Sequence, residues 1–147
     1  MAVFHYLRLR TFAHATEDPE KVRLALRHAA QDDARKLALE ETRVEGSHGN
    51  AITILEAEQK SAPAAKRVFQ ALARDDPTGF DRVVREANAR VDDHLNFHLR
   101  LDKQEAFAGH AVLATDEDAI TLRGKLRQFS GSPQADLVAF LVEIREG

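Results

Sequence analysis

Cations and histidines alternate with apolar residues in two segments of this sequence, 94–101 and 118–128. The alternation has the two-residue period of a β-strand, which places polar side chains on one face and apolar side chains on the other. The polar face of the first segment carries His94, Asn96, His98 and Arg100. The polar face of the second carries Thr121, Arg123, Lys125 and Arg127. On neighbouring strands these residues would form a platform suited to RNA, because cations bind phosphates and guanidinium planes stack on unpaired bases.

The first strand-like segment, 3–13, adds Arg8 and Arg10 to this set. By alternation they share a face with three aromatic residues, Phe4, Tyr6 and Phe12. An exposed sheet that mixes cations with aromatic rings favours the binding of single-stranded nucleic acid. The alternative is a solvated face on which the arginines pair with Glu56 and Glu58, and the sequence leaves both interpretations open.

Histidines can also bind metals, but the spacing of His94 and His98 argues against a shared ion. Positions four apart on a strand lie about 13 Å from each other at ~3.3 Å per residue, whereas each metal–ligand bond is only about 2 Å long. We therefore expect no metal site and no cofactor. For catalysis, Ser47 and His48 are adjacent in the chain, but a dyad also needs an oriented base and an oxyanion site. The sequence predicts a protein that is not an enzyme.

Two short polar runs allow two interpretations each. The run 46–50, Gly-Ser-His-Gly-Asn, is a turn by composition. Its backbone N–H groups could meet a phosphate, which makes Asn50 a candidate contact, or it could simply connect two strands of a hairpin. The run 102–104, Asp-Lys-Gln, comes directly after the strand at 94–101. It is either a site or a turn whose aspartate caps the next segment of the chain.

Composition limits the classes of function. The net charge is −3, so any RNA site must be a local basic patch rather than a property of the whole chain. The absence of cysteine excludes disulfides, thiolate zinc sites and a cysteine nucleophile. The apolar run at 137–142 is too short to span a bilayer, and the N-terminus does not have the pattern of a signal peptide. We expect a soluble cytoplasmic protein that does not bind membranes.

The elements that must position these residues can be predicted from hydrophobic periodicity. The predicted strands are 3–13, 37–45, 51–59, 94–101, 110–114 and 118–128. The predicted helices are 19–30, 62–74, 79–91 and a last helix that begins at Pro133. Asp75-Asp76-Pro77 should separate the second helix from the third, because the residue before proline avoids the helical conformation. The order β-α-β-β-α-α-β-β-β-α in one domain, 1–147, predicts an α+β fold, a largely antiparallel sheet with helices on one face and the other face open.

Four segments carry a resemblance to a known family: 12–18, 46–52, 100–109, and Asp118-Ala119-Ile120 followed by Lys125. They resemble an archaeal family described as RNA-binding proteins or predicted exosome-associated proteins, and the resemblance covers nearly the whole chain. It implies a fold like that of the ribosomal protein that binds 5S rRNA in the large subunit. It also implies RNA as the partner, with a link to exosome RNA processing or ribosome maturation and with exosome or ribosomal components as further candidate partners.

The residues and the resemblance together predict an RNA site made of Arg100, Lys103, Gln104, Arg123, Lys125, Arg127 and Asn50. Two other classes of function remain. A protein-interaction or assembly factor without direct RNA contact would show an exposed apolar patch or an open strand edge. An enzyme would need a pocket around Asp102, Lys103 and a histidine.

Overall fold

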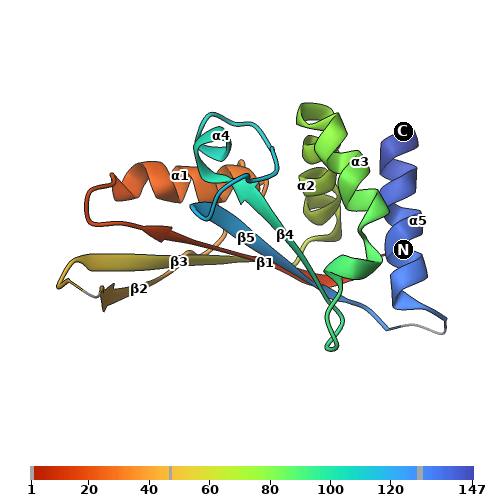
Figure 1. Ribbon diagram of the computed structural model, residues 1–147, viewed down its shortest axis with the longest axis horizontal. Coiled ribbons are helices and arrows are strands. Elements are labelled where there is room, and N and C mark those ends of the chain that lie inside the picture. Colours follow the sequence, from red (N-terminus) through yellow and green to blue (C-terminus); the bar gives the residue numbers. More distant parts are fainter. Residues whose placement is uncertain (1, 47, 129–130) are drawn as a thin grey trace.

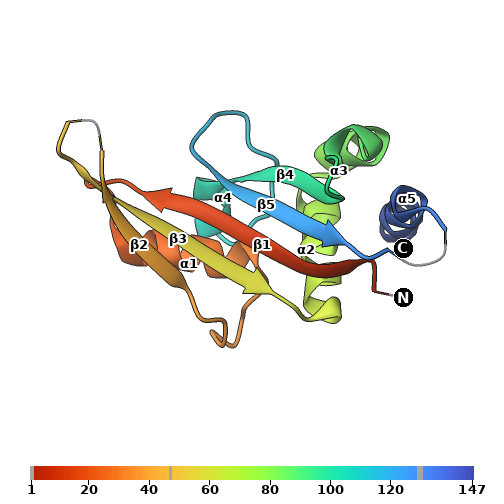
Figure 2. The same ribbon diagram turned by 90° about the horizontal axis from the view of Figure 1, so that it is seen from below.

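A sheet forms one layer of the molecule and the helices form the other (Figure 1). The computed structural model describes residues 2–46, 48–128 and 131–147, and over these residues five strands pair antiparallel in the order β2-β3-β1-β5-β4. The strands are β1 (Phe4–Ala13), β2 (Glu40–Glu45), β3 (Ala51–Gln59), β4 (Asn96–Asp102) and β5 (Ala119–Leu126). Figure 2 shows the sheet from below, with its strands in front of α1, α2 and α4. The predicted α+β class and the open sheet face are confirmed.

All four prolines of the sequence stand in the first turn of a helix, directly after a capping side chain or one residue later. The four helices are α1 (Pro19–Ala29), α2 (Ala62–Asp75), α3 (Pro77–Arg85) and α5 (Pro133–Glu146). Their N-caps are Asp18, Ser61, Asp76 and Ser132, and each side chain accepts a backbone N–H of the first turn. Proline suits this position because its fixed φ is helical and because a backbone N–H in the first turn would have no acceptor within the helix. No helix in the described part of the chain is long and apolar enough to cross a membrane.

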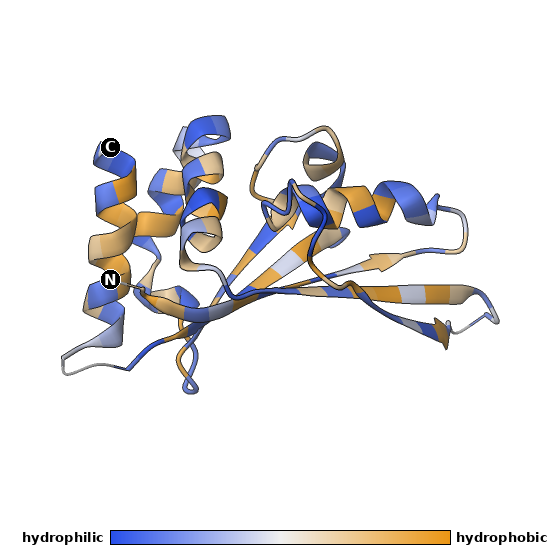
Figure 3. Ribbon diagram, turned by 180° about the vertical axis from the view of Figure 1, so that it is seen from behind, coloured by the Kyte–Doolittle hydropathy of each residue, from blue (hydrophilic) through white to orange (hydrophobic). Residues whose placement is uncertain are grey.

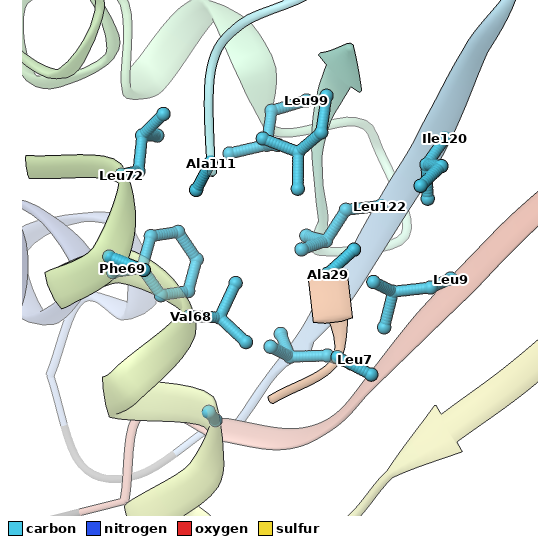
Figure 4. Close-up of a cluster of buried hydrophobic side chains, with 14 of the residues drawn as sticks. Leu7, Leu9, Ala29, Val68, Phe69, Leu72, Leu99, Ala111, Ile120 and Leu122 are labelled. Carbon is cyan, nitrogen blue, oxygen red and sulfur yellow. The ribbon is translucent and has the colours of Figure 1, made fainter. Parts of the chain in front are cut away.

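The core lies between the helices and the sheet face that they cover. The strands alternate hydrophilic and hydrophobic residues along their length (Figure 3). Leu7 of β1 and Leu122 of β5 point toward Val68 and Phe69 of α2, and Leu9 of β1 lies beside Ala29 of α1 (Figure 4). An aromatic cluster extends this core: the stacked rings of Phe4 and Phe69 each lie within 6.2 Å, by centroid, of the rings of Phe97 and Phe140. β1 lies at the centre of the sheet, as its apolar residues on both faces predict.

Phe4 is an exception to the predicted alternation of β1. The pairing of β1 with β5 shifts register between Phe4 and Tyr6, which turns the Phe4 side chain to the helix side of the sheet. There it stacks on Phe69 with centroids 5.5 Å apart. Gly124 of β5 leaves room for the Phe4 ring, because a Cβ at this glycine would lie 2.6 Å from the ring. Phe4 is therefore a core residue, and its predicted place on the open face was wrong.

The predicted strand at 110–114 is a single antiparallel bridge between Leu101 and Leu113. Two of its backbone N–H groups bind side chains instead of a strand: the Ala111 N–H donates to the Asp75 carboxylate at 2.9 Å, and the Leu113 N–H donates to the Asp76 carboxylate at 3.1 Å. These carboxylates stand at the junction of α2 and α3. The segment is therefore held by that junction as well as by β4, where the Asp102 N–H donates to the Val112 carbonyl oxygen and the Ala114 N–H donates to the Arg100 carbonyl oxygen.

The segment before β4 also differs from the prediction. The predicted helix 79–91 ends at Arg85 and is followed by a short 3-10 helix, Asn88–Arg90. β4 itself begins at Asn96, because Leu95 has a φ of 62° and the Asp92 carboxylate accepts the N–H groups of His94 and Asn96. His94 is therefore in a turn and not on the strand face. At the other strand boundaries, β2 begins three residues later than predicted, at Glu40.

The helix α4 (Lys103–Phe107) is absent from the predicted elements. Its N-cap is Asp102, whose carboxylate accepts the Glu105 N–H at 2.9 Å. The interpretation of this aspartate as a cap is thus confirmed. Sequence periodicity does not detect α4 because one helical turn and a half is too short to show a period.

Candidate functional site

The side of the sheet away from the helices, the open face, carries the predicted cations in two rows. Strand register sets each row, because directly paired residues of antiparallel strands point to the same side. One row runs across β3, β1, β5 and β4 as Glu58, Arg8, Arg123 and His98. The next row runs across the same strands as Glu56, Arg10, Thr121 and Arg100. The sequence prediction that these cations meet on one face is confirmed for Arg100 and Arg123, and Lys125 follows one row further along β5.

On the part of the open face next to β3 and β2, glutamates neutralise the charge of Arg8. Arg8 contacts three carboxylates: its guanidinium lies 3.0 Å from Glu56, 3.4 Å from Glu40 and 3.6 Å from Glu58. The hydrogen bond to Glu56, assisted by the charges of Glu40 and Glu58, raises the pKa of Arg8 above its usual value. On this side the arginine is a partner of glutamates, as the alternative interpretation of the sequence holds.

The part on β5 and β4 is different. The side chains of Arg100 and Arg123 are exposed, and neither makes a hydrogen bond or ion pair with any described residue. Lys125 is half-buried, and its ammonium group donates to the carbonyl oxygen of His94. We call Arg10, Arg100, Arg123 and Lys125 the cationic strip.

Arg10, on β1, links the strip to an aromatic ring. Its guanidinium carbon lies 5.3 Å from the ring centroid of Phe12, two residues along the same strand face. Phe12 is 39% exposed, which is high for a phenylalanine on a sheet. Ile54 stands directly opposite it on β3.

A hollow of about 350 Å³ lies over the middle of the open face. Its lining includes Arg8, Arg10, His98, Arg100, Thr121 and Arg123. At its rim, the His98 ring nitrogen lies 2.8 Å from the Asp92 carboxylate. The hydrogen bond with His98, together with the N–H of Asn96, lowers the pKa of Asp92. The hollow therefore presents an excess of positive charge to an anion, with one carboxylate of β3, Glu56, at its border.

Lys103, predicted as an RNA contact, lies in the interior with 2% of its surface exposed. Its ammonium nitrogen is 2.7 Å from Asp118, 3.0 Å from Glu17 and 3.0 Å from the carbonyl oxygen of Phe12. We call Lys103 with Glu17 and Asp118 the Lys103 cluster. Lys103 is therefore buried among three oxygen acceptors and does not lie with the exposed cations of the open face, where the sequence analysis grouped it.

Sequence periodicity contains the signal for this burial. Lys103 continues the alternation of Leu99 and Leu101, both of which point into the core. A polar residue in phase with buried leucines predicts a buried group with internal partners. The polar composition of the run Asp-Lys-Gln, which is typical of an exposed turn, masks this signal.

The three remaining predicted residues do not join the strip. Gln104 is exposed on α4, in the helix layer on the other side of the sheet. Asn50 is at the far end of the β2–β3 hairpin, where its carbonyl oxygen accepts the Gly46 N–H at 2.6 Å. Arg127 is half-buried directly beyond β5. In the turn at 46–50, Ser47 lies outside the described residues, so the turn is described only as a hairpin connection closed by the Gly46–Asn50 bond.

Two members of the Lys103 cluster, Glu17 and Asp118, also belong to the one set of potential metal ligands found among the described residues. One ligand atom from each of His14, Glu17 and Asp118 lies within 4.8 Å of the others. The ammonium group of Lys103 already contacts both carboxylates of this set. A lysine therefore supplies the positive charge that a metal ion would bring.

Residues 6–126 match a protein family described as RNA binding. The chain belongs to this RNA-binding family. RNA-binding protein PAB1135 of Pyrococcus abyssi is 34% identical over 135 residues, which cover 89% of this chain and 87% of that protein. The uncharacterized protein MJ0213 of Methanocaldococcus jannaschii is 29% identical over 119 residues, 78% of each chain.

The fold is also known from a solved relative. Mth689, a DUF54 protein from Methanothermobacter thermautotrophicus, superimposes with a TM-score of 0.72 at 27% identity, over 97% of this chain and 98% of that one. The agreement over the full length supports the α+β architecture and places the chain among archaeal relatives.

Three of the segments that resemble the RNA-binding family meet at the Lys103 cluster. Glu17 comes from the segment 12–18, Lys103 from 100–109, and Asp118 precedes β5. These signature residues bind one another and join the ends of three strands. The cationic strip lies on the open face, and two of its four residues, Arg100 and Lys125, also belong to the segments that resemble the family.

Proposed function

We propose that this chain is a non-catalytic RNA-binding protein whose binding site is the cationic strip on the open face. One observation carries the proposal: Arg100 and Arg123 are exposed on neighbouring strands, in adjacent rows of the open face, and neither side chain has a partner in the described chain. Unpaired guanidinium groups in a concave region are positioned to bind phosphate oxygens, often through two hydrogen bonds at once. Membership of the RNA-binding family supports the choice of RNA as the anion.

The non-catalytic part of the proposal is supported by the roles of the polar groups near the family signature. Asp102 caps α4, and Lys103 is held by Glu17 and Asp118. Both groups that an enzyme would use at this position therefore have structural partners. The proposal also places the protein in the cytoplasm and in exosome RNA processing or ribosome maturation, on a fold like that of the 5S-rRNA-binding ribosomal protein. The support for this cellular role is the family resemblance together with the exposed cations of the open face.

Charge reversal tests the site. We expect the double variant Arg100→Glu/Arg123→Glu to bind RNA at least tenfold more weakly than the parent protein at about 0.1 M salt. Each lost phosphate contact should also reduce the slope of log affinity against log salt by about 0.7 for single-stranded RNA. Fluorescence anisotropy with labelled RNA across a salt series measures both quantities.

The matched control is Arg67→Glu/Arg85→Glu, which makes the same charge change on α2 and α3. Arg67 and Arg85 are also exposed and without a partner in the described chain, but they lie in the helix layer. The proposal requires a large loss of RNA affinity in Arg100→Glu/Arg123→Glu and little change of RNA affinity in the control. Equal losses would show a non-specific effect of net charge, and no loss in either variant would place the RNA site elsewhere.

A second candidate function, docking of a partner protein, has its own supporting observation. Phe12 and Val44 are each 39% exposed on the open face, at the end of the sheet away from β4. β2 is an edge strand, and all of its residues are exposed. An apolar patch beside an open strand edge is a feature of protein-binding surfaces. Loss of a pulled-down partner on Val44→Lys, with RNA affinity unchanged, would favour this function.

A further inference from the structure

We propose that the cationic strip binds single-stranded RNA, with one sugar–phosphate backbone along the strip and an unpaired base stacked at the Arg10–Phe12 pair. The inference rests on the proposed function and specifies the form of RNA that the site accepts. It follows from the width of the strip, the charge of its border, the hollow within it and the aromatic residue at its end.

The strip is too narrow for two backbones. It lies on β1, β5 and β4, and at about 4.8 Å between strands this makes it about 10 Å wide. On the next strand stand Glu56 and Glu58, which border the strip on that side. Duplex RNA is recognised through phosphates and hydroxyls on both sides of its minor groove. A second backbone placed toward β3 would lie over carboxylates, which repel it.

The hollow also favours unpaired nucleotides. Its volume of about 350 Å³ is near the lower end of the range for small-molecule sites. Arg100 and Arg123 stand at its wall as donors without internal acceptors. A nucleotide that enters the hollow must leave the stack of its neighbours, and single strands allow this at little cost, whereas a duplex must first be opened.

The Arg10–Phe12 pair supplies the stacking platform. The ring of Phe12 is exposed at the end of the strip, with the Arg10 guanidinium 5.3 Å from its centroid. Both groups are flat and both stack on nucleobases, with little preference for base type. Tyr6, which pairs with Lys125, is six residues from Phe12, so the site is about 20 Å long at ~3.3 Å per residue. This length fits a short single-stranded segment.

The first experiment compares two forms of the same RNA. A labelled unstructured oligonucleotide of mixed sequence and its perfect duplex are titrated with the full chain in anisotropy measurements across salt. We expect the single strand to bind at least tenfold more tightly, with a salt slope between about −2 and −3 for three to four phosphate contacts. Equal or tighter binding of the duplex overturns the inference and leaves the proposed function intact. Binding of neither form overturns both.

The second experiment separates stacking from charge. Phe12→Ala should weaken binding of the single strand on the order of tenfold without changing the salt slope, because it removes a stacking partner and no cation. Phe12→Leu serves as a second variant that keeps apolar volume beside Ile54 and should show the same loss.

The control is Phe107→Ala, which among the described residues removes the other phenylalanine that is at once exposed and paired with a cation. Phe107 is 36% exposed on α4 and has the Lys21 ammonium nitrogen 5.6 Å from its ring centroid. It lies on the helix side, so its removal should leave RNA affinity unchanged. If Phe12→Ala and Phe12→Leu both bind as tightly as the parent chain, or if Phe107→Ala causes the loss instead, the stacking site at Phe12 is wrong.

Discussion

Lys103 is 2% exposed and contacts three oxygen acceptors, whereas Arg123 on the other side of the sheet is exposed and contacts none within the described chain. Both residues belong to sequence segments that indicate RNA binding. A cation whose neighbours already neutralise it stabilises the fold, because its burial is compensated by its partners. A cation without such neighbours adds little to the fold and remains available to an external anion. Internal partners, rather than the residue type, thus separate structural charge from binding charge in this molecule.

The largest expected effect is on the structural side of this comparison. Lys103→Met keeps the length of the side chain but leaves Glu17 and Asp118 close together without a cation. Removal of one partner from a buried ion pair costs several kcal/mol, and since both carboxylates here are partly exposed we expect about 3 kcal/mol. Urea denaturation measures the loss. Lys125→Met, the same change on the open face, should alter stability by less than about 0.5 kcal/mol.

The two lysine variants should show the reverse order in RNA affinity, which makes the comparison testable in both directions. If the Lys103→Met variant still folds, it should bind RNA as tightly as the parent chain does. The Lys125→Met variant should bind RNA more weakly than the parent chain. A folded Lys103→Met with lost RNA affinity and normal stability would show that the lysine contacts RNA after all.

The second prediction concerns the packing beneath the strip. Gly124→Ala places a methyl group 2.6 Å from the Phe4 ring, and an aromatic ring in a packed core cannot move aside freely. Overpacking of this kind costs about 2 kcal/mol. Because Gly124 faces the helices and Arg123 faces the open side, thermal stability should fall while RNA affinity stays. Addition of Phe4→Leu should restore part of the stability in a double-mutant cycle. If the losses in unfolding free energy caused by Gly124→Ala and Phe4→Leu simply add, the proposed clash is contradicted.

Much of the fold could be predicted from local sequence, and the reasons are visible in particular residues. The four prolines with their capping neighbours mark the starts of the four long helices. The alternation in β1, β3, β4 and β5 identifies the strands and their faces. The errors lie where tertiary partners decide the local structure: the register shift that turns Phe4 inward, and the segment 110–114, whose N–H groups bind Asp75 and Asp76.

For the candidate site, the face on which the cations lie could be predicted from the sequence, but their internal partners could not. Arg100, Arg123 and Lys125 could be placed together because strand parity alone puts them on one face. Which of the cations are neutralised could not be predicted, since it depends on which strand lies beside which. Arg8 is paired because β3 and β2 bring Glu56 and Glu40 to it.

A third prediction compares paired and unpaired arginines on the same face. Arg8→Ala leaves three glutamates on β2 and β3 without their shared cation, and we expect a loss of about 1 kcal/mol, the upper range for ion pairs that water reaches. Arg100→Ala removes no internal contact and should change stability by less than about 0.5 kcal/mol. RNA affinity should fall more for Arg100→Ala. If the two variants lose equal RNA affinity, pairing with the glutamates does not keep Arg8 from binding RNA.

The smallest expected effect is the pH dependence of stability, which tests whether the paired carboxylates matter as a group. A hydrogen bond from Arg23 lowers the pKa of Glu41, and one from Arg74 lowers the pKa of Asp75. A carboxylate with a lowered pKa in the folded state adds stability above its unfolded pKa, and this stability is lost as pH falls through the folded value. The free energy of unfolding should therefore be flat from about pH 7 to 5 and decline below about pH 4.

Asp75→Asn isolates one of these groups. It removes the charge facing Arg74 while an amide oxygen can still accept the Ala111 N–H, so the loss at pH 7 should be about 1 kcal/mol or less. Since Asn does not titrate, the decline in stability between about pH 5 and 3 should be shallower in the variant than in the parent chain. Urea midpoints at four or five pH values measure both slopes. Parallel curves would mean that the Asp75 carboxylate has the same proton affinity in the folded and unfolded chain, which the contacts with Arg74 and Ala111 contradict.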